Sequence, residues 1–577
     1  MTTRHPDPST FDHGFREQYL DYTRLTRQMQ AWADAYPDIV RLQSLGQTPE
    51  HRELWLLTVG PEPERVRPAV WVDGNMHAVE LAGSSVALAI AEAAIRLHLN
   101  TGLEDLGIAD AVLPELQEVL FHILPRISPD GAERVLRQGG MVRSVPRPMP
   151  GEKSAPYWEP EDLDGDGRCR FLRIADPGGD FVQSERHPGL MLPRRPDDPP
   201  PWYRLYPEGR IANWDGLTIP DPDFLAGTTD LNRNFPHDWQ PEPEQTGAGP
   251  YPGSEPESIA VVRFAVDHPN LYAWLNLHTF GGVFIRPLGN KPDTDMNPAD
   301  LAVYRQLAEW GRQHTGYPTV SGFEEFTYDP GKPLHGDLSD FAYHQRGCLS
   351  LVCELWDLFA RLSMPEQHRF VDNYTAHGRE EVERLAEWDA EHNKGRVFQG
   401  WRQIEHPQLG TVEVGGHDPL IGVWNPPPEA LADVCAGLTR YWLQVARLLP
   451  RIVLEEVLVT RLAEGLVEVR ATAANYGYLG TRGLPSAHHL PWNTPLYADL
   501  ETRDCRLAHP ERSHQQLGHL DGWGRGMGNG ADLPWYQSSP GNGHRRTVRW
   551  LVHGEGTVTL RVGNARVGWI ERTVNAC

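Results

Sequence analysis

Apolar runs of strand length recur through the first 450 residues, and polar or helical patterns separate them. Four largely apolar runs predict buried strands, at residues 68–73, 119–124, 271–277 and 349–354. Apolar positions spaced three and four apart predict helices at residues 19–36, 83–99, 258–266, 301–315, 365–393 and 431–449. Residues 40–45 and 54–59 predict a hairpin or two neighbouring strands. The alternation predicts an α/β fold with a largely parallel or mixed sheet.

Two stretches depart from this pattern. Residues 146–228 are rich in Pro, Gly, Asp and Arg, which predicts an irregular insertion packed over a functional face. After Pro450 short alternating runs predict strands without helices, as in a small all-β sandwich. A chain of 577 residues is too long for one ordinary core. The sequence therefore predicts two domains, at residues 1–450 and 451–577.

Composition narrows the classes of partner. A hydrophobic fraction of 40% and a charged fraction of 23% are typical of a soluble globular protein. The net charge of −24 argues against binding nucleic acid or anionic membranes. The first residues lack the pattern of a signal peptide, and no apolar run approaches the ~20 residues of a membrane span. Six scattered cysteines favour reduced thiols, so a cytoplasmic location is expected.

A His and a Glu, three positions apart, follow the first predicted buried strand. His77 and Glu80 have the short spacing of a nitrogen and oxygen pair that zinc favours. Alone, the pair reads equally well as a surface His and a Glu that begins a helix. His278 ends another predicted strand, 198 residues after Glu80, and supplies a distant third ligand. Two strand ends that each deliver a ligand favour a metal site at this edge of the sheet.

Hydrolytic chemistry at such a metal needs further groups. A zinc with three protein ligands keeps a place for water and lowers the pKa of that water to about 7. A carboxylate must then accept the proton, and Glu354 ends a third predicted strand. Cations must stabilise the oxyanion that develops, and Arg126, Arg143 and Arg233 are the candidates.

A second metal pattern lies inside the predicted insertion. Asp162, Asp164 and Asp166 occupy the first, third and fifth positions of a possible calcium loop, with Gly167 at the sixth. The twelfth position is Arg173, where such loops carry a bidentate Glu. The alternatives are therefore a bound Ca²⁺ and a network of Asp and Gly turns.

An ordered set of short motifs belongs to a region of roughly residues 15–450. The motifs are Gly-Asn-Met-His77-Ala-Val-Glu80, Ser-Pro-Asp130-Gly131, Arg143, Asp-Leu-Asn232-Arg233-Asn-Phe, Pro-Gly-Ser-Glu-Pro-Glu257, Leu-Asn-Leu-His278-Thr-Phe, Asp340-Phe-Ala-Tyr343 and Leu-Val-Cys-Glu354-Leu. In this set the chain resembles the zinc carboxypeptidases typified by pancreatic carboxypeptidase A. The resemblance implies a mixed twisted sheet flanked by helices, and it does not extend to residues 451–577.

The resemblance also implies roles for individual residues. His77, Glu80 and His278 look like the ligands of one zinc ion per chain. Glu354 looks like the general base and acid, and Arg143 looks like the arginine that polarises the scissile carbonyl. Asn232 and Arg233 look like the pair that binds the terminal carboxylate of a substrate, and Tyr328 is the candidate for the mobile tyrosine that closes over it.

The chain departs from the family in three places. Val79 stands where relatives often carry a substrate-binding Arg. Ser339 and Val352 are expected in the pocket for the terminal side chain, and their lack of charge argues against a preference for charged residues. The insertion is large enough to roof the cleft and restrict it to short or unusual peptides.

The pattern as a whole predicts a zinc-dependent metallocarboxypeptidase that hydrolyses the last amide bond of a peptide. One alternative is a related zinc amidohydrolase or deacylase, which acts on a small carboxylate-bearing substrate or a modified peptide. A second alternative is a non-catalytic binding protein on an inherited hydrolase fold, which loss of a ligand or of Glu354 would indicate. Neither is lost. The tryptophans of residues 451–577 suggest binding of carbohydrate or a partner, against a plain supporting role.

Overall fold

The computed structural model describes residues 6–109, 112–147, 155–222, 228–329, 331–375, 377–527, 539 and 541–576. Its central sheet has eight strands: β1 (Val40–Gln47), β2 (Glu53–Val59), β3 (Ala69–Gly74), β4 (Leu120–Leu124), β11 (Leu271–Thr279), β12 (Val283–Arg286), β13 (Thr319–Ser321) and β14 (Leu349–Leu355). Their order is β1-β2-β4-β3-β11-β14-β12-β13. The four middle strands run parallel, and β1, β2 and β12 introduce antiparallel pairs. The predicted mixed α/β sheet is confirmed.

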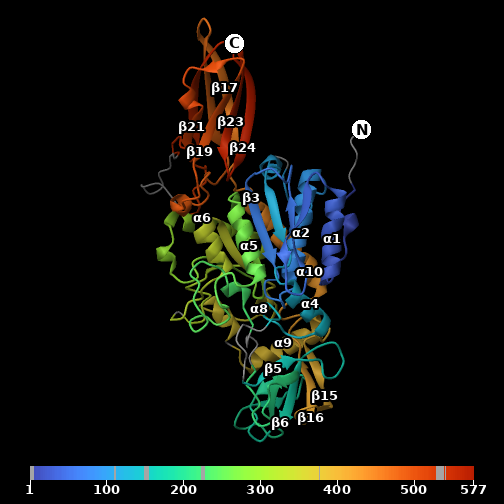
Figure 1. Ribbon diagram of the computed structural model, residues 1–577. Helices are drawn as coiled ribbons and strands as arrows, with labels where there is room; N and C mark the ends of the chain where they lie inside the picture. The colour runs from blue at the N-terminus through green and yellow to red at the C-terminus, as the bar shows by residue number, and fades with distance from the viewer. Residues whose placement is uncertain are drawn as a thin grey trace.

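Helices cover both faces of this sheet, as Figure 1 shows. The longer helices are α1 (Tyr22–Ala35), α2 (Ala82–Leu99), α5 (Pro256–Asp267), α6 (Pro298–Thr315), α9 (Arg379–His392) and α10 (Pro428–Ala446). In β3, Val70 and Val72 pack in the cluster that holds α2 and α10, whereas Ala69 and Trp71 pack with α5. This alternation buries the strand on both faces, which explains its continuously apolar sequence. Helix α2 has the length and composition of a membrane span, but 83% of it is buried inside the molecule.

Shorter helices and helical turns complete residues 1–450. They are η1 (Pro8–Phe11), α3 (Leu113–Leu116), α4 (Pro129–Gln138), η3 (Leu231–Arg233), η4 (Asp293–Asp295), α7 (Leu338–Asp340), η5 (Phe341–Gln345), α8 (Leu358–Arg361) and η6 (Phe370–Tyr374). The single long helix predicted at residues 365–393 is wrong, because this segment forms two separate elements, the short turn η6 and the helix α9. Gly378 caps α9 at its N-terminus, and its amide donates to Glu381 Oε2 at 2.8 Å. The cap fixes the start of the helix after a glycine that disfavours a helix interior.

The insertion at residues 146–228 is more regular than predicted. It forms β5 (Tyr157–Pro160), β6 (Phe171–Ala175), β7 (Phe181–Gln183), β8 (Met191–Pro193), β9 (Tyr203–Pro207) and β10 (Gly209–Ala212). Strand β6 pairs with β16 (Gly410–His417), which in turn pairs with β15 (Phe398–His406). Because the partner strands come from more than 200 residues along the chain, the sequence of the insertion alone does not show its sheet.

The C-terminal part consists of two antiparallel sheets. Their strands are β17 (Ile452–Ala463), β18 (Leu466–Asn475), β19 (Leu496–Arg503), β20 (Arg506–Leu507), β21 (His514–Gly518), β22 (Arg545–His553), β23 (Gly556–Asn564) and β24 (Gly568–Ala576), and two turns, η7 (Pro485–His489) and η8 (Pro510–Arg512), join some of them. The sheet orders are β17-β18-β22-β20 and β21-β19-β23-β24. Alternate residues of β18, β19 and β23 enter one apolar cluster. The predicted all-β region is confirmed.

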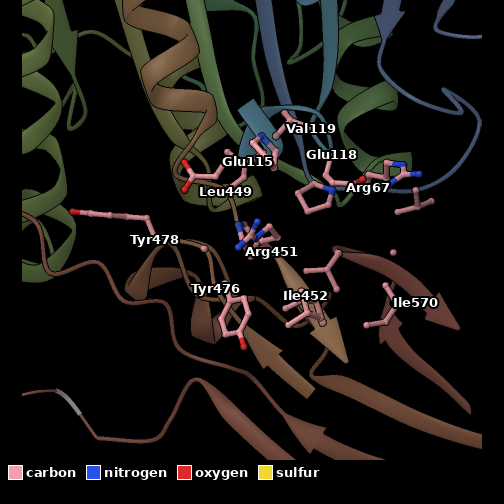
Figure 2. Close-up of a pocket in the computed structure, with 18 of the residues that line it drawn as sticks. Arg67, Glu115, Glu118, Val119, Leu449, Arg451, Ile452, Tyr476, Tyr478 and Ile570 are labelled. Atoms are coloured by element: carbon pink, nitrogen blue, oxygen red, sulfur yellow. Dashed lines mark hydrogen bonds and ion pairs between the residues drawn. The ribbon is translucent and has the colours of Figure 1, made fainter. Parts of the chain in front are cut away.

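These sheets lie at the end of the molecule opposite the insertion sheet (Figure 1). A cavity of about 380 Å³ remains at the junction, where Glu115 and Leu449 face Arg451 and Tyr476 (Figure 2). Beside this cavity, the C-terminal sheets contact the central sheet directly. The guanidinium of Arg566 donates to the carbonyl oxygens of Leu271 at 3.3 Å and Gly347 at 3.1 Å. These carbonyls lie at the start of β11 and just before β14.

Candidate active site

The predicted ligands meet at the carboxyl ends of two neighbouring strands. His77 and Glu80 lie in the turn between β3 and α2, and His278 lies near the end of β11. The turn is tight because a Cβ at Gly74 would lie only 2.6 Å from the carbonyl carbon of Gly83. Asn75 holds it by donating to the carbonyl oxygen of His77 at 2.8 Å. The glycines and the asparagine therefore fix where the ligands point.

The three ligand side chains converge on one point. His77 Nδ1 lies 2.8 Å from Glu80 Oε1 and 3.0 Å from His278 Nδ1. His278 Nδ1 lies 3.0 Å from Glu80 Oε2. All three side chains are at least 97% buried. Burial would raise the pKa of Glu80, but the two imidazoles hold it below its usual value.

Acceptor side chains behind the ligands set their tautomers. His77 Nε2 lies 3.1 Å from Asp230 Oδ1, and His278 Nε2 lies 2.5 Å from Asn276 Oδ1. The amide nitrogen of Asn276 donates to Asp73, so its oxygen faces His278. Both Nε2 atoms therefore carry protons, which leaves the Nδ1 lone pairs directed at each other and at Glu80. Such an arrangement needs a shared cation, and two imidazoles with one carboxylate suit zinc.

Arg143 and Glu354 face the same point from two sides. Arg143 Nε donates to Asp230 Oδ2 at 3.1 Å, and its Nη1 lies 3.6 Å from Glu80 Oε1. Burial opposes the charge of Asp230, yet Arg143 and His77 hold the pKa of this carboxyl well below its usual range. Burial and the Glu80 carboxylate instead raise the pKa of Glu354, and Arg143 lowers it. Within the described residues the Glu354 carboxylate accepts no hydrogen bond, so it is available to a substrate.

Both groups open into a cavity of about 200 Å³. Asn232 and Arg233, from η3, line it together with the three ligand residues. The amide oxygen of Asn232 accepts from the backbone of Leu338 at 2.9 Å, which leaves its amide nitrogen for a ligand. Tyr328 also lines the cavity and is 56% exposed, as a side chain at the rim would be. The residues predicted from separate motifs are thus brought to one cavity.

Comparison with known proteins now fits this geometry. A sequence model described as zinc carboxypeptidase matches residues 25–163 and 202–373, which is more than half of the chain. The chain belongs to the zinc carboxypeptidase family. Residues 451–575 match a model described as a domain of unknown function. Family membership and the cluster of His77, Glu80 and His278 both imply zinc.

Individual relatives are similar over only part of their length. Carboxypeptidase D of Anas platyrhynchos is 31% identical over 152 residues, which is 26% of this chain and 10% of that protein. The catalytic chain of human carboxypeptidase N is 30% identical over 135 residues, which is 23% of this chain and 27% of that one. Among solved structures, thrombin activatable fibrinolysis inhibitor aligns with a TM-score of 0.41 at 15% identity, covering 77% of each chain. Carboxypeptidase A of Helicoverpa armigera aligns at 0.36 and 18% identity, covering 59% of this chain and 65% of that chain.

Several predictions about this carboxypeptidase-family site need correction. Arg126 does not reach the cavity, because its guanidinium is buried and donates to the carbonyl oxygen of Leu20 at 2.8 Å. Ser339 and Val352 do line the cavity, but charged Arg286 and Asp337 line it too. The absence of charge at the first two positions therefore says little about the preferred terminal residue.

The insertion does not roof the cavity in the part of it that the structure describes. Its residues 155–222 are absent from the lining of the catalytic cavity. They line an adjacent apolar cavity of about 420 Å³ instead, with Phe171, Phe181 and Leu205 among its walls. Phe280 lines both cavities, so the apolar cavity that the insertion helps to form adjoins the site.

Calcium at the insertion is not supported. Asp162 accepts backbone amides of Gly165 at 2.7 Å and Gly167 at 2.8 Å. Asp164 pairs with Arg402 at 2.7 Å, and Asp166 pairs with Arg170. The arginines supply the positive charge that a calcium ion would bring, and the network of Asp and Gly turns describes the segment.

Three supporting residues were missed by the sequence analysis. Asp230 and Asn276 stand inside the quoted motifs, each two positions before a predicted site residue. In β11 that spacing puts Asn276 on the same face as His278, so the sequence could have predicted that the two side chains lie together. Tyr374 also lines the cavity, where its hydroxyl donates to the carbonyl oxygen of Phe280. It comes from η6, inside a segment predicted to be one long helix, so no signal pointed to it.

Proposed function

We propose that this chain is a zinc metallocarboxypeptidase, a hydrolase that cleaves the C-terminal amide bond of peptides. One observation carries the proposal. Arg233 and Asn232 line the same small cavity as the three ligand residues and Glu354. A carboxylate bound by that pair would place the adjoining amide beside the metal, which is the requirement for removing a terminal residue.

Each residue then has a task. His77, Glu80 and His278 would hold the zinc ion, which would supply a Lewis acid and a nucleophile derived from water. Glu354 accepts the proton of the attacking water and passes it to the leaving amine. Arg143 donates to the carbonyl oxygen as negative charge develops on it. Asp230 holds Arg143 and His77 in place from behind.

A second candidate function is hydrolysis of an acyl or otherwise modified small substrate that carries a carboxylate. The apolar cavity beside Phe280 supports it, because an acyl group or apolar side chain would be buried there. Both functions use the same metal and the same arginine. They differ in what lies on the side of the scissile bond away from the carboxylate.

A digestion experiment separates the two. The zinc-loaded protein is incubated with a library of unblocked peptides and a matched set of N-acyl amino acids, and the products are read by mass spectrometry. Sequential loss of C-terminal residues supports the carboxypeptidase, and preferential cleavage of the acyl set supports the second function. Internal cleavage of peptides, or no cleavage of either set, would contradict both.

We also propose the wider setting of this activity. Residues 1–450 would form the catalytic domain and residues 451–577 an accessory domain. Peptides or small carboxylate-bearing molecules would be the partners, and the net charge of −24 supports the exclusion of nucleic acid and anionic membranes. A cytoplasmic location is supported by five cysteines that are free in the structure. Fractionation of the native host followed by activity assay tests the location.

A further inference from the structure

A second group of metal-ligating side chains lies behind the wall of the catalytic cavity. His237, Asp340 and His344 form this rear cluster, and one ligand atom from each lies within 4.8 Å of the other two. Ligands bound to one tetrahedral zinc lie about 3.4 Å apart, so small side-chain rotations bring these atoms to bonding positions. No residue of the rear cluster belongs to the ligand set of the catalytic site.

Two adjoining helical turns place the ligands. Asp340 is the last residue of α7, and His344 lies four residues later in the π-helical turn η5. His237 comes from the loop after η3 and stacks on His344, with ring centroids 4.2 Å apart and planes at 19°. The rings of the catalytic pair, His77 and His278, are 4.6 Å apart. Single π-helical turns are rare and are frequently found at functional sites.

The carboxylate of the cluster has few partners. Asp340 is 2% exposed, and among the described residues its two oxygens accept only from the backbone amide of Gly289, at 3.2 and 3.0 Å. Burial and the nearby charge of Asp337 raise the pKa of Asp340 well above its usual value. A buried carboxylate with one donor and acidic neighbours is unfavourable unless a cation or a proton reaches it.

The imidazoles of the cluster are also free to bind. Within the described residues, neither His237 nor His344 has a recorded hydrogen bond to its ring nitrogens. Burial lowers the pKa of both, that of His344 to about 4, so both are neutral near pH 7. Neutral imidazole is the form that coordinates metals.

We propose that His237, Asp340 and His344 bind a second transition-metal dication of the zinc type. Two nitrogen ligands and one carboxylate suit Zn²⁺ or Co²⁺, whereas Ca²⁺ and Mg²⁺ take oxygen ligands. His344 also lines a cavity of about 510 Å³ with Lys291 and His489, which gives the ion a route from solvent and room for a water ligand. The proposal does not depend on the activity proposed above.

The second ion would brace the pocket for the terminal residue of the substrate. Gly289 and Asp337 both line the catalytic cavity. Gly289 is hydrogen-bonded to Asp340, and Asp337 accepts from the backbone amide of Asp340 at 2.9 Å. An ion on Asp340 therefore fixes the backbone on two sides of that cavity.

Metal content tests the proposal directly. The full chain is loaded with Zn²⁺, dialysed and analysed by elemental and native mass spectrometry, with folding checked by circular dichroism. We expect about two ions per chain in the unmodified protein and about one in His344→Gln and in His237→Gln. His77→Gln should also keep about one ion, and the double variant His77→Gln/His344→Gln should bind none.

Controls make the result decisive. His335→Gln changes a neighbouring imidazole that pairs with Asp238 at 2.7 Å and is outside the rear cluster, so it should keep both ions. Asp340→Asn preserves size, and it serves if a histidine variant fails to fold. Cobalt loading should give two visible absorption spectra, one lost in His77→Gln and the other in His344→Gln. One ion in the unmodified chain, or two in the folded rear-cluster variants, overturns the proposal. If the unmodified chain holds both ions but hydrolyses neither the peptides nor the N-acyl amino acids, that result would instead count against the proposed function.

Discussion

One oxygen of Asp230 lies 3.1 Å from Nε2 of His77. Its other oxygen lies 3.1 Å from Nε of Arg143, so one buried carboxylate orients a metal ligand and the arginine beside the reacting carbonyl. The sequence shows the three residues in three separate motifs. Only the fold makes them one unit.

Asp230→Asn should therefore impair metal binding and turnover together. Asparagine keeps the size of the side chain but removes its charge. Its amide nitrogen would face one of the two donors, His77 Nε2 or Arg143 Nε, where the native carboxylate offers an accepting oxygen. We expect zinc affinity to fall roughly 10- to 100-fold, measured by competition with a chelator. The exposed Asp267→Asn is the control and should behave as the unmodified protein. Unchanged affinity would show that Asp230 does not orient His77.

Glu354→Gln should separate chemistry from metal binding. The amide cannot accept the proton, so kcat should fall by roughly 10²- to 10⁴-fold. Glu354 is not among the three converging ligands, and zinc content should therefore stay unchanged. Retained turnover would remove Glu354 from its proposed role. Loss of zinc would make it a ligand.

Arg233→Ala should discriminate between substrates by their terminus. Loss of the cation should raise KM for free-acid peptides by roughly 10- to 100-fold, the worth of a charged hydrogen bond. Peptide amides lack the carboxylate, so their already poor cleavage should change little. Arg233→Lys should recover part of the loss through charge alone. Equal effects on acids and amides would show that Arg233 does not bind the carboxylate.

The free energy of unfolding should fall as the pH is lowered, because of a buried imidazole that does not line the cavity. Burial, with a contribution from His268, lowers the pKa of His122 to about 3. The pKa of this imidazole in the unfolded chain is about 6.5, so the unfolded state binds the proton at a higher pH than the folded state does. Lowering the pH therefore stabilises the unfolded state relative to the folded state. The group should cost about 2 kcal/mol of unfolding free energy between about pH 7.5 and about pH 5.

Urea unfolding across this range measures the effect. His122→Asn can keep the contact with the Thr58 hydroxyl, which lies 3.0 Å from Nδ1, but it does not titrate. The variant should show a shallower loss of stability with falling pH than the unmodified protein at the same metal load. Parallel curves would mean that His122 is not responsible.

Local sequence patterns predicted most of the fold and most of the candidate site. Strands such as β3 and β11 are buried on both faces, so their runs are continuously apolar and their ends are easy to place. His77, Glu80, His278 and Glu354 lie at or just after the ends of β3, β11 and β14, and they were therefore predictable as a group. The insertion sheet was not, because β6 takes its partner from β16. The rear cluster was missed for a similar reason, since His237 and Asp340 are distant in sequence and meet only after folding.

Arg566 contacts the starts of β11 and β14, and the other ends of these strands carry His278 and Glu354. The two strands run in parallel register, with His278 opposite Glu354. A side chain from the C-terminal sheets thus secures, at a distance of roughly seven residues or 23 Å, the strands that present a metal ligand and the proposed base. A shortened chain that ends at residue 450 would keep every active-site side chain and lose this anchor. The activity of such a shortened chain should therefore depend on whether the two strands stay aligned, because all of its active-site residues are present.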